Sequence, residues 1–161
     1  MRLTKKCLTI LCLGLVFALA VQAQQPRKKP TPKTPRPEVE YLTSPRPRPA
    51  PYSDAVRVGN MLYLSGKLGT DSAGRLVAGG IQAETRQTME NIGAVLVRNG
   101  SSFDQVVKCT VMLTDISEWG AMNEVYVTFF AKDRMPARSA LGVNGLVLNA
   151  RVEIECLATV R

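Results

Sequence analysis

The chain has 161 residues, enough for one domain, and its lack of histidine excludes Ser-His-Asp and Cys-His catalysis as well as histidine-ligated metal sites. Its four cysteines form no C-x-x-C pair and its glycines match no phosphate-binding loop, so we expect neither a zinc or iron–sulfur site nor a nucleotide-phosphate loop. The net charge of +8 comes entirely from residues 1–37, because residues 38–161 hold 13 cations and 13 acids. A neutral domain does not favour a nucleic-acid-binding face.

Residues 1–23 have the pattern of a secretory signal peptide. A basic start precedes the apolar run Cys7–Ala20, which is short for a membrane span. Small residues at Val21 and Ala23 predict cleavage after Ala23 and no membrane contact beyond the signal; an uncleaved N-terminal anchor is the alternative. We expect export into an oxidising compartment, most simply a bacterial periplasm.

Residues 24–37 form a linker that contains five prolines, five cations and no acid. This composition predicts an extended segment, partly in the polyproline II conformation. It favours a solubilising tether, with contact to anionic lipid or cell wall as the alternative. We expect the globular domain to occupy residues 38–161.

The domain begins with short strand patterns. Val39 and Tyr41 alternate with acidic residues and indicate a first strand. Residues 55–58 and 61–65 flank Gly59-Asn60, a pair that predicts a hairpin turn. Another turn is expected at residues 71–74.

Two helices and a buried strand follow. Residues 80–99 have a helical period and a natural stop at Asn99-Gly100, with one apolar stripe formed by Ile81, Met89, Ile92, Val95 and Leu96. The β-branched run 106–114 predicts a buried strand. Residues 115–118 have the pattern of a capping box that opens a second helix, which Pro136 should end. We expect its stripe to be core: Trp119, Met122, Tyr126, Phe129 and Phe130.

The last two strands are expected at residues 138–143 and 151–160. In the final strand Glu153 and Glu155 should face away from the apolar positions. The order of strands, helix, strand, helix and two strands predicts an α+β fold, a mixed sheet with both helices packed on one face. Cys109 and Cys156 lie in strands, where two buried thiols are favoured over a disulfide.

Arg138 and Glu153 are the residues most suited to chemistry. Arginine binds a carboxylate with two parallel hydrogen bonds, and glutamate can serve as a base for water. Together they predict a site that holds a small carboxylic acid and hydrolyses a neighbouring bond. An ion pair between Arg138 and Glu153 or Glu155 across adjacent strands is the structural alternative.

The domain resembles the Rid proteins (reactive intermediate deaminases) over nearly all of residues 38–161. The resemblance rests on short stretches in the same order: Pro51-Tyr52-Ser53-Asp54-Ala55-Val56, Tyr63-Leu64-Ser65-Gly66, Gln87-Thr88-Met89-Glu90-Asn91-Ile92, Val111-Met112-Leu113-Thr114-Asp115, Met122-Asn123-Glu124-Val125-Tyr126, Pro136-Ala137-Arg138-Ser139 and Val152-Glu153-Ile154-Glu155. It implies a chorismate-mutase-like fold, a homotrimer with clefts between subunits, and cofactor-free hydrolysis of 2-imino acids to 2-keto acids and ammonia.

The resemblance also implies roles by position. Arg138 would bind the substrate carboxylate, Glu153 would position or activate water, and Tyr52 would line the pocket. The substrate would also meet Ser65, Gly66 and Ala140. Asn91 and Asn123 lie in family motifs and are expected to be structural.

The chain departs from the family at several positions. Ala140 stands where a cysteine is frequent, Lys67 where a glutamine is common, and Leu146-Val147 where Leu-Pro is usual. Lys67 would add a cation near the cleft. The rival hypotheses are a non-catalytic module that binds a small carboxylate and a holdase-like interaction protein on the same fold.

Overall fold

The computed structural model describes residues 36–45 and 50–160, which belong to one compact unit. The predicted signal peptide 1–23 and nearly all of the predicted linker 24–37 lie outside the described residues. Among the described residues, neither helix has the length and apolar character needed to span a bilayer.

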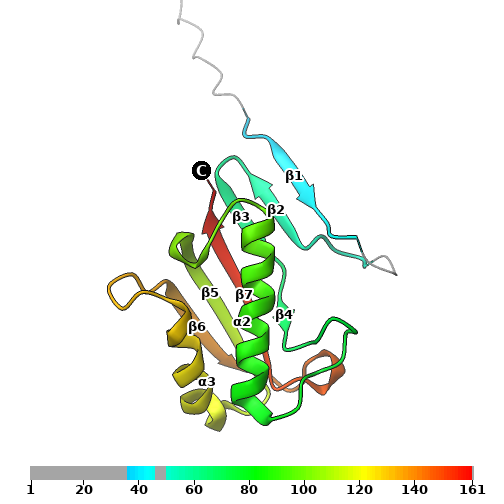
Figure 1. The fold of residues 1–161 in the computed structure, drawn as a ribbon, viewed down its shortest axis with the longest axis vertical. Helices are drawn as coiled ribbons and strands as arrows, with labels where there is room; N and C mark the ends of the chain where they lie inside the picture. The colour runs from blue at the N-terminus through cyan, green and yellow to red at the C-terminus, as the bar shows by residue number, and fades with distance from the viewer. Residues whose placement is uncertain (1–35, 46–49, 161) are drawn as a thin grey trace, which may run out of the picture. The chain divides into compact units, whose positions relative to one another are not determined.

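The centre of the unit is a mixed sheet in the order β1-β2-β3-β7-β5-β6, with β4 pairing with β7 beside β3 (Figure 1). Adjacent strands in the sheet run antiparallel, except β5 and β6, which run parallel. The strands are β1 Val39–Leu42, β2 Ala55–Val58, β3 Met61–Leu64, β4 Lys67–Leu68, β5 Val106–Leu113, β6 Ala137–Gly142 and β7 Val152–Thr159. The predicted strands are therefore confirmed, and β4 is an addition.

The predicted hairpin joins β2 to β3. Gly59 has φ of 59°, a conformation that side chains disfavour, and it occupies the first central position of the turn. The register sets Ala55 opposite Leu64, so both enter the core from neighbouring strands.

Two helices cover one face of the sheet (Figure 1), α2 Gly80–Arg98 and α3 Trp119–Tyr126. A 3-10 turn at Ile116–Glu118 precedes α3, and Asp115 accepts a hydrogen bond from the Ser117 amide at its start. The second helix ends well before Pro136, contrary to prediction. The chain passes through a 3-10 turn at Val127–Phe129 and becomes extended at Phe130.

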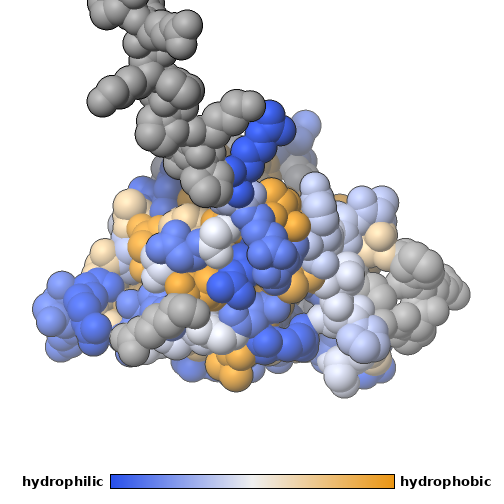
Figure 2. Space-filling view, turned by 90° about the horizontal axis from the view of Figure 1, so that it is seen from above, coloured by the Kyte–Doolittle hydropathy of each residue, from blue (hydrophilic) through white to orange (hydrophobic). Residues whose placement is uncertain are grey.

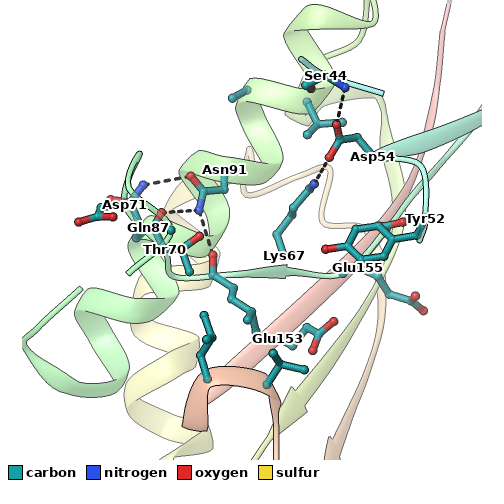
Figure 3. Close-up of a pocket in the computed structure, with 18 of the residues that line it drawn as sticks. Ser44, Tyr52, Asp54, Lys67, Thr70, Asp71, Gln87, Asn91, Glu153 and Glu155 are labelled. Atoms are coloured by element: carbon teal, nitrogen blue, oxygen red, sulfur yellow. Dashed lines mark hydrogen bonds and ion pairs between the residues drawn. The ribbon is translucent and has the colours of Figure 1, made fainter. Parts of the chain in front are cut away.

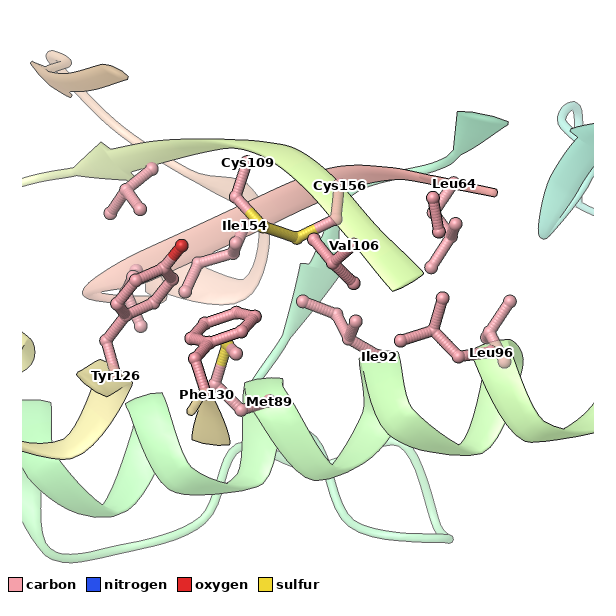
Figure 4. Packing of buried hydrophobic residues seen from close by; sticks show 14 of the residues in the cluster. Leu64, Met89, Ile92, Leu96, Val106, Cys109, Tyr126, Phe130, Ile154 and Cys156 are labelled. Carbon is pink, nitrogen blue, oxygen red and sulfur yellow. A yellow bond between two sulfur atoms is a disulfide. The ribbon is translucent and has the colours of Figure 1, made fainter. Parts of the chain in front are cut away.

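The core lies between the helices and the sheet (Figure 4). The predicted stripe of α2 is entirely buried, and alternate residues of β7 face it. Each fully buried leucine, isoleucine or methionine contributes roughly 1.5–3 kcal/mol. The second stripe is confirmed only in part: Met122, Tyr126 and Phe130 are buried, whereas Trp119 is 43% exposed.

Cys109 of β5 and Cys156 of β7 form a disulfide (Figure 4). The preference for two free thiols is therefore wrong. The two residues are direct partners in the antiparallel register, with Cα atoms 4.1 Å apart, and their side chains leave the same face of the sheet. This register, which the sequence does not show, brings the sulfur atoms together.

Candidate active site

Glu153 lies in β7 on the face of the sheet opposite the core. Its carboxyl group lies against the backbone of Gly66, where an added Cβ would collide with it. Partial burial raises the pKa of Glu153, and the neighbouring negative charge of Glu155 raises it further. A carboxylate with a raised pKa binds a proton more readily, which suits a general base.

Glu153 opens onto a cavity of about 1020 Å³ (Figure 3). Four of the predicted site residues line this cavity together: Tyr52, Ser65, Gly66 and Glu153. Ser65 donates a hydrogen bond of 2.7 Å to the Ser53 carbonyl, which ties the segment that carries Tyr52 to the cavity wall.

Lys67 lines the same cavity, as expected for a cation near the cleft, but its charge has a partner. Its Nζ atom lies 2.8 Å from Oδ1 of Asp54, and both side chains are largely buried (Figure 3). Asp54 also accepts a 2.7 Å hydrogen bond from the Ser44 amide through Oδ2. The ion pair offsets the added positive charge and joins two segments of the cavity wall.

Arg138 occupies a separate place, on β6 beneath α3. Its Nη1 atom donates a 2.7 Å hydrogen bond to Oδ1 of Asn123. Its Cζ atom lies 4.7 Å from the ring centroid of Tyr126 and 5.5 Å from that of Trp119. Two aromatic contacts and one amide hold the guanidinium group in a fixed orientation.

The environment of Arg138 is apolar on one side. Burial raises the pKa of Tyr126 to about 12, although the positive charge of Arg138 lowers it. The Tyr126 hydroxyl group has no hydrogen-bond partner among the described residues. Ala140 lies two residues further along β6, on the same face as Arg138. Its side chain packs against the core.

Arg138 and Glu153 lie on opposite faces of the sheet within one chain. Arg138 pairs in register with Cys109, which faces the core, and Cys109 pairs with Cys156. Glu153 precedes Cys156 by three residues and so points the other way. Strand β5 also separates their strands, so the alternative of an ion pair across adjacent strands is wrong.

The residues that orient Arg138 were predicted as core or structural. Trp119, Asn123 and Tyr126 follow one another at helical spacings of four and three, so the sequence carried a signal that they share a face of α3. Asn91, expected to be structural, lines the cavity, and its Nδ2 atom donates 2.9 Å hydrogen bonds to the carbonyls of Leu68 and Thr70. Among the described residues, no group of three or more cysteines and carboxylates is placed to bind a metal.

Comparisons with known proteins identify the family. Residues 43–160 match the family model described as Endoribonuclease L-PSP. The chain is 45% identical over 109 residues to the mouse (Mus musculus) 2-iminobutanoate/2-iminopropanoate deaminase, across 67% of this chain and 80% of that protein. The human protein of the same name is 44% identical over 109 residues, across 67% of this chain and 79% of that protein.

Solved structures share the fold. Yeast Mmf1 superimposes with a TM-score of 0.72 at 31% identity, covering 77% of this chain and all of that one. RidA from the Antarctic bacterium Psychrobacter gives a TM-score of 0.66 at 35% identity, covering 79% of this chain and all of that one. The predicted α+β, chorismate-mutase-like fold is confirmed. The chain belongs to the Rid family.

Proposed function

We propose that this protein is a cofactor-independent deaminase that hydrolyses 2-imino acids to 2-keto acids and ammonia. The observation that carries the proposal is its 44–47% identity to mammalian proteins named 2-iminobutanoate/2-iminopropanoate deaminase. The oriented guanidinium of Arg138 and the raised pKa of Glu153 supply the groups that this reaction needs.

The reaction needs little beyond positioning and a group that can take up and return the protons of the attacking water. Arg138 would hold the substrate carboxylate with two hydrogen bonds, which aligns the imine carbon for attack. Glu153 would accept a proton from water as the oxygen bonds to that carbon. With the imine nitrogen protonated, Glu153 would return this proton to the nitrogen of the adduct. It would then take the second proton of the former water as the carbonyl forms and ammonia leaves, and release that proton to solvent.

The cleft would have to be shared between two copies of the chain. Arg138 and Glu153 lie on opposite sheet faces, so a substrate that touches both must lie between chains. Tyr63, Val107 and Leu141 are each 43–50% exposed, an apolar surface that assembly would cover. Figure 2, seen from above, shows hydrophobic residues interspersed among hydrophilic ones at that end of the domain. These observations support an assembly with clefts between chains, and the family resemblance supports three copies with one cleft at each interface.

We also propose that the mature protein works outside the cytoplasm. The signal-like pattern of residues 1–23 supports export, and the buried Cys109–Cys156 disulfide is a feature of proteins from oxidising compartments. Mass spectrometry of the protein purified from its native cells tests both points: a chain that begins at Gln24 with an intact disulfide is expected, and a chain that keeps residue 1 contradicts export by cleavage.

Turnover is tested with imines generated in situ by an amino-acid oxidase, with semicarbazide trapping what remains. The wild type should accelerate loss of the imine and release of ammonia, and Arg138→Ala and Glu153→Gln should each abolish both. Binding of the keto acid without ammonia release would instead support the rival carboxylate-binding module.

Mixing the two inactive variants tests the shared cleft. Trimers are dissociated, mixed in equal amounts and reassembled. If Arg138 comes from one chain and Glu153 from the next, every mixed trimer regains one complete cleft, which is about a quarter of all clefts after random reassembly. No recovery in trimers shown by native mass spectrometry to be mixed would refute the shared cleft. Because the two residues lie on opposite sheet faces of one chain, it would also show that they do not act in the same site.

RNA cleavage is the second candidate, because the matching family model is described as an endoribonuclease. The neutral charge of residues 38–161 and the absence of histidine count against it. Cleavage of a labelled RNA that survives repurification and is lost in Arg138→Ala would support this candidate, and no cleavage is expected.

A further inference from the structure

The segment before β7 adds two exposed apolar side chains to the cavity that contains Glu153. Val147 and Leu148 both line this cavity, and they are 69% and 56% exposed. Large aliphatic side chains this exposed are ordinary when scattered. Here two consecutive ones border the cavity proposed to hold the substrate.

The backbone of this segment is held in an unfavourable conformation. Leu148 and Asn149 both have φ of 60°, in the left-handed region that branched side chains disfavour. The amides of Asn149 and Ala150 donate to the carbonyls of Leu146 and Val147, at 3.1 and 3.2 Å. An unfavourable conformation kept at the edge of a cavity is a reason to look for a function.

The segment is fixed to the body of the protein at its end. The Arg151 amide donates a 2.9 Å hydrogen bond to the buried carboxylate of Glu84, and Arg151 binds Glu118 through Nη1 at 2.6 Å. Ala150 is fully buried. Val147 and Leu148 are thus presented to the cavity on an anchored turn.

The charges around the cavity favour an apolar ligand group over an anionic one. Glu153 and Glu155 contribute acidic groups, whereas Asp71 is paired with Arg75 and the cation Lys67 is paired with Asp54. The remaining lining cation, Arg98, is exposed and hydrogen-bonds Ser44 through its guanidinium. A second carboxylate on the substrate would therefore meet like charges, whereas an alkyl group would lose water against Val147 and Leu148.

We infer that Val147 and Leu148 form a subsite for the substrate side chain, which selects 2-imino acids with branched or longer alkyl side chains over the alanine-derived imine. The inference rests on the proposed deaminase function. One or two extra methylene groups on a substrate that fit an apolar pocket raise its kcat/KM roughly tenfold over that of the shorter substrate.

Two conservative variants test the subsite. Leu148→Asn keeps the size of the side chain and suits the left-handed backbone, but it removes the apolar surface. Val147→Ser is matched by Val97→Ser, because Val97 is 72% exposed on α2 and does not line the cavity. The substrates are the imines that an amino-acid oxidase makes from alanine and from leucine.

In the wild type, kcat/KM for the leucine-derived imine should exceed that for the alanine-derived imine about tenfold. Leu148→Asn and Val147→Ser should each lower the leucine value about fivefold and the alanine value less than twofold, and Val97→Ser should change neither. An unchanged ratio in both cavity variants overturns the inference. Loss of assembly in Leu148→Asn also overturns it, because Leu148 would then pack against another chain.

Failure of the proposed function is distinguishable from failure of the subsite. If the wild type hydrolyses neither imine, the deaminase proposal falls, and the subsite is judged by calorimetric binding of 4-methyl-2-oxopentanoate and 2-oxopropanoate. Tighter binding of the larger acid that Leu148→Asn abolishes supports the subsite. Equal binding of the two acids refutes it.

Discussion

Replacing Asn123 with alanine should weaken substrate binding by releasing Arg138. The amide oxygen of Asn123 accepts a 2.7 Å charge-assisted hydrogen bond from Nη1 of Arg138. Hydrogen bonds of this kind are worth about 1.5–3 kcal/mol. The contacts with Tyr126 and Trp119 remain, so we expect part of this free energy to be lost, about 1.4–2 kcal/mol, or a ten- to thirtyfold fall in kcat/KM.

The fall should appear mainly in KM. Arg138 would bind the carboxylate equally in the substrate and in the transition state, and uniform binding affects KM more than kcat. Steady-state rates with 2-iminobutanoate check this. Asn99→Ala is the control, because among the described residues the Asn99 side chain hydrogen-bonds only the Val95 carbonyl at the end of α2. A large loss of kcat at unchanged KM, or no loss at all, would refute the positioning role of Asn123.

Three further perturbations test the structure. Removing the Cys109–Cys156 disulfide, which closes a 47-residue separation, should cost about 4 kcal/mol and lower Tm by about 15 °C at fixed protein concentration; a shift of a few degrees would contradict the loop-closure estimate. Gly66→Ala should displace the Glu153 carboxyl group and cut activity at least about tenfold with an unchanged circular dichroism spectrum; full activity would show that the carboxyl position is unimportant. Activity should fall as pH drops through the Glu153 pKa, which lies above the ordinary value of 4.5. An acidic limb of the pH–activity profile with its midpoint at or below 4.5 would argue against Glu153 as the base.

The partly buried, charged carboxylate of Glu153 should also lower the free energy of unfolding. The raised pKa of Glu153 means that the folded state favours the protonated carboxyl group. The stability that this preference gives the folded state is fully present below the pKa of the unfolded chain and is lost as pH rises through the pKa of the folded state. At neutral pH, Glu153→Gln should therefore unfold at the same or a higher temperature than the wild type. Thermal scans at pH 5 and pH 8 check this: the advantage of the variant should be larger at pH 8, and the reverse order would show that burial does not destabilise the carboxylate.

Local patterns predicted most of the fold. The helix α2 and the hairpin at Gly59 depend on contacts between residues close in sequence, and both were found at the expected places. The disulfide was missed because it depends on the register of β5 against β7, which is set by the whole sheet. The end of the second helix was missed because Phe130 leaves it to pack in the core.

The site was predicted as a list of residues and not as an arrangement. Motif order identified Arg138 and Glu153, but their separation follows from β5 lying between β6 and β7, a non-local pairing. The hydrogen bond from Arg138 to Asn123 was equally invisible, because it joins a strand to a helix that precedes it. The helical spacing of Trp119, Asn123 and Tyr126 indicated a shared face without indicating what that face would hold.

The placement of Arg138 and Glu153 on opposite faces has a consequence for gene dosage. In the proposed trimer each chain lends its arginine to one cleft and its glutamate to another. A chain that lacks only Arg138, made beside the normal chain, would reduce activity in proportion to its abundance. A chain that lacks both residues would inactivate two clefts at once. Activity would then fall with the square of the fraction of normal chains, so an allele that encodes both substitutions would be the more dominant one.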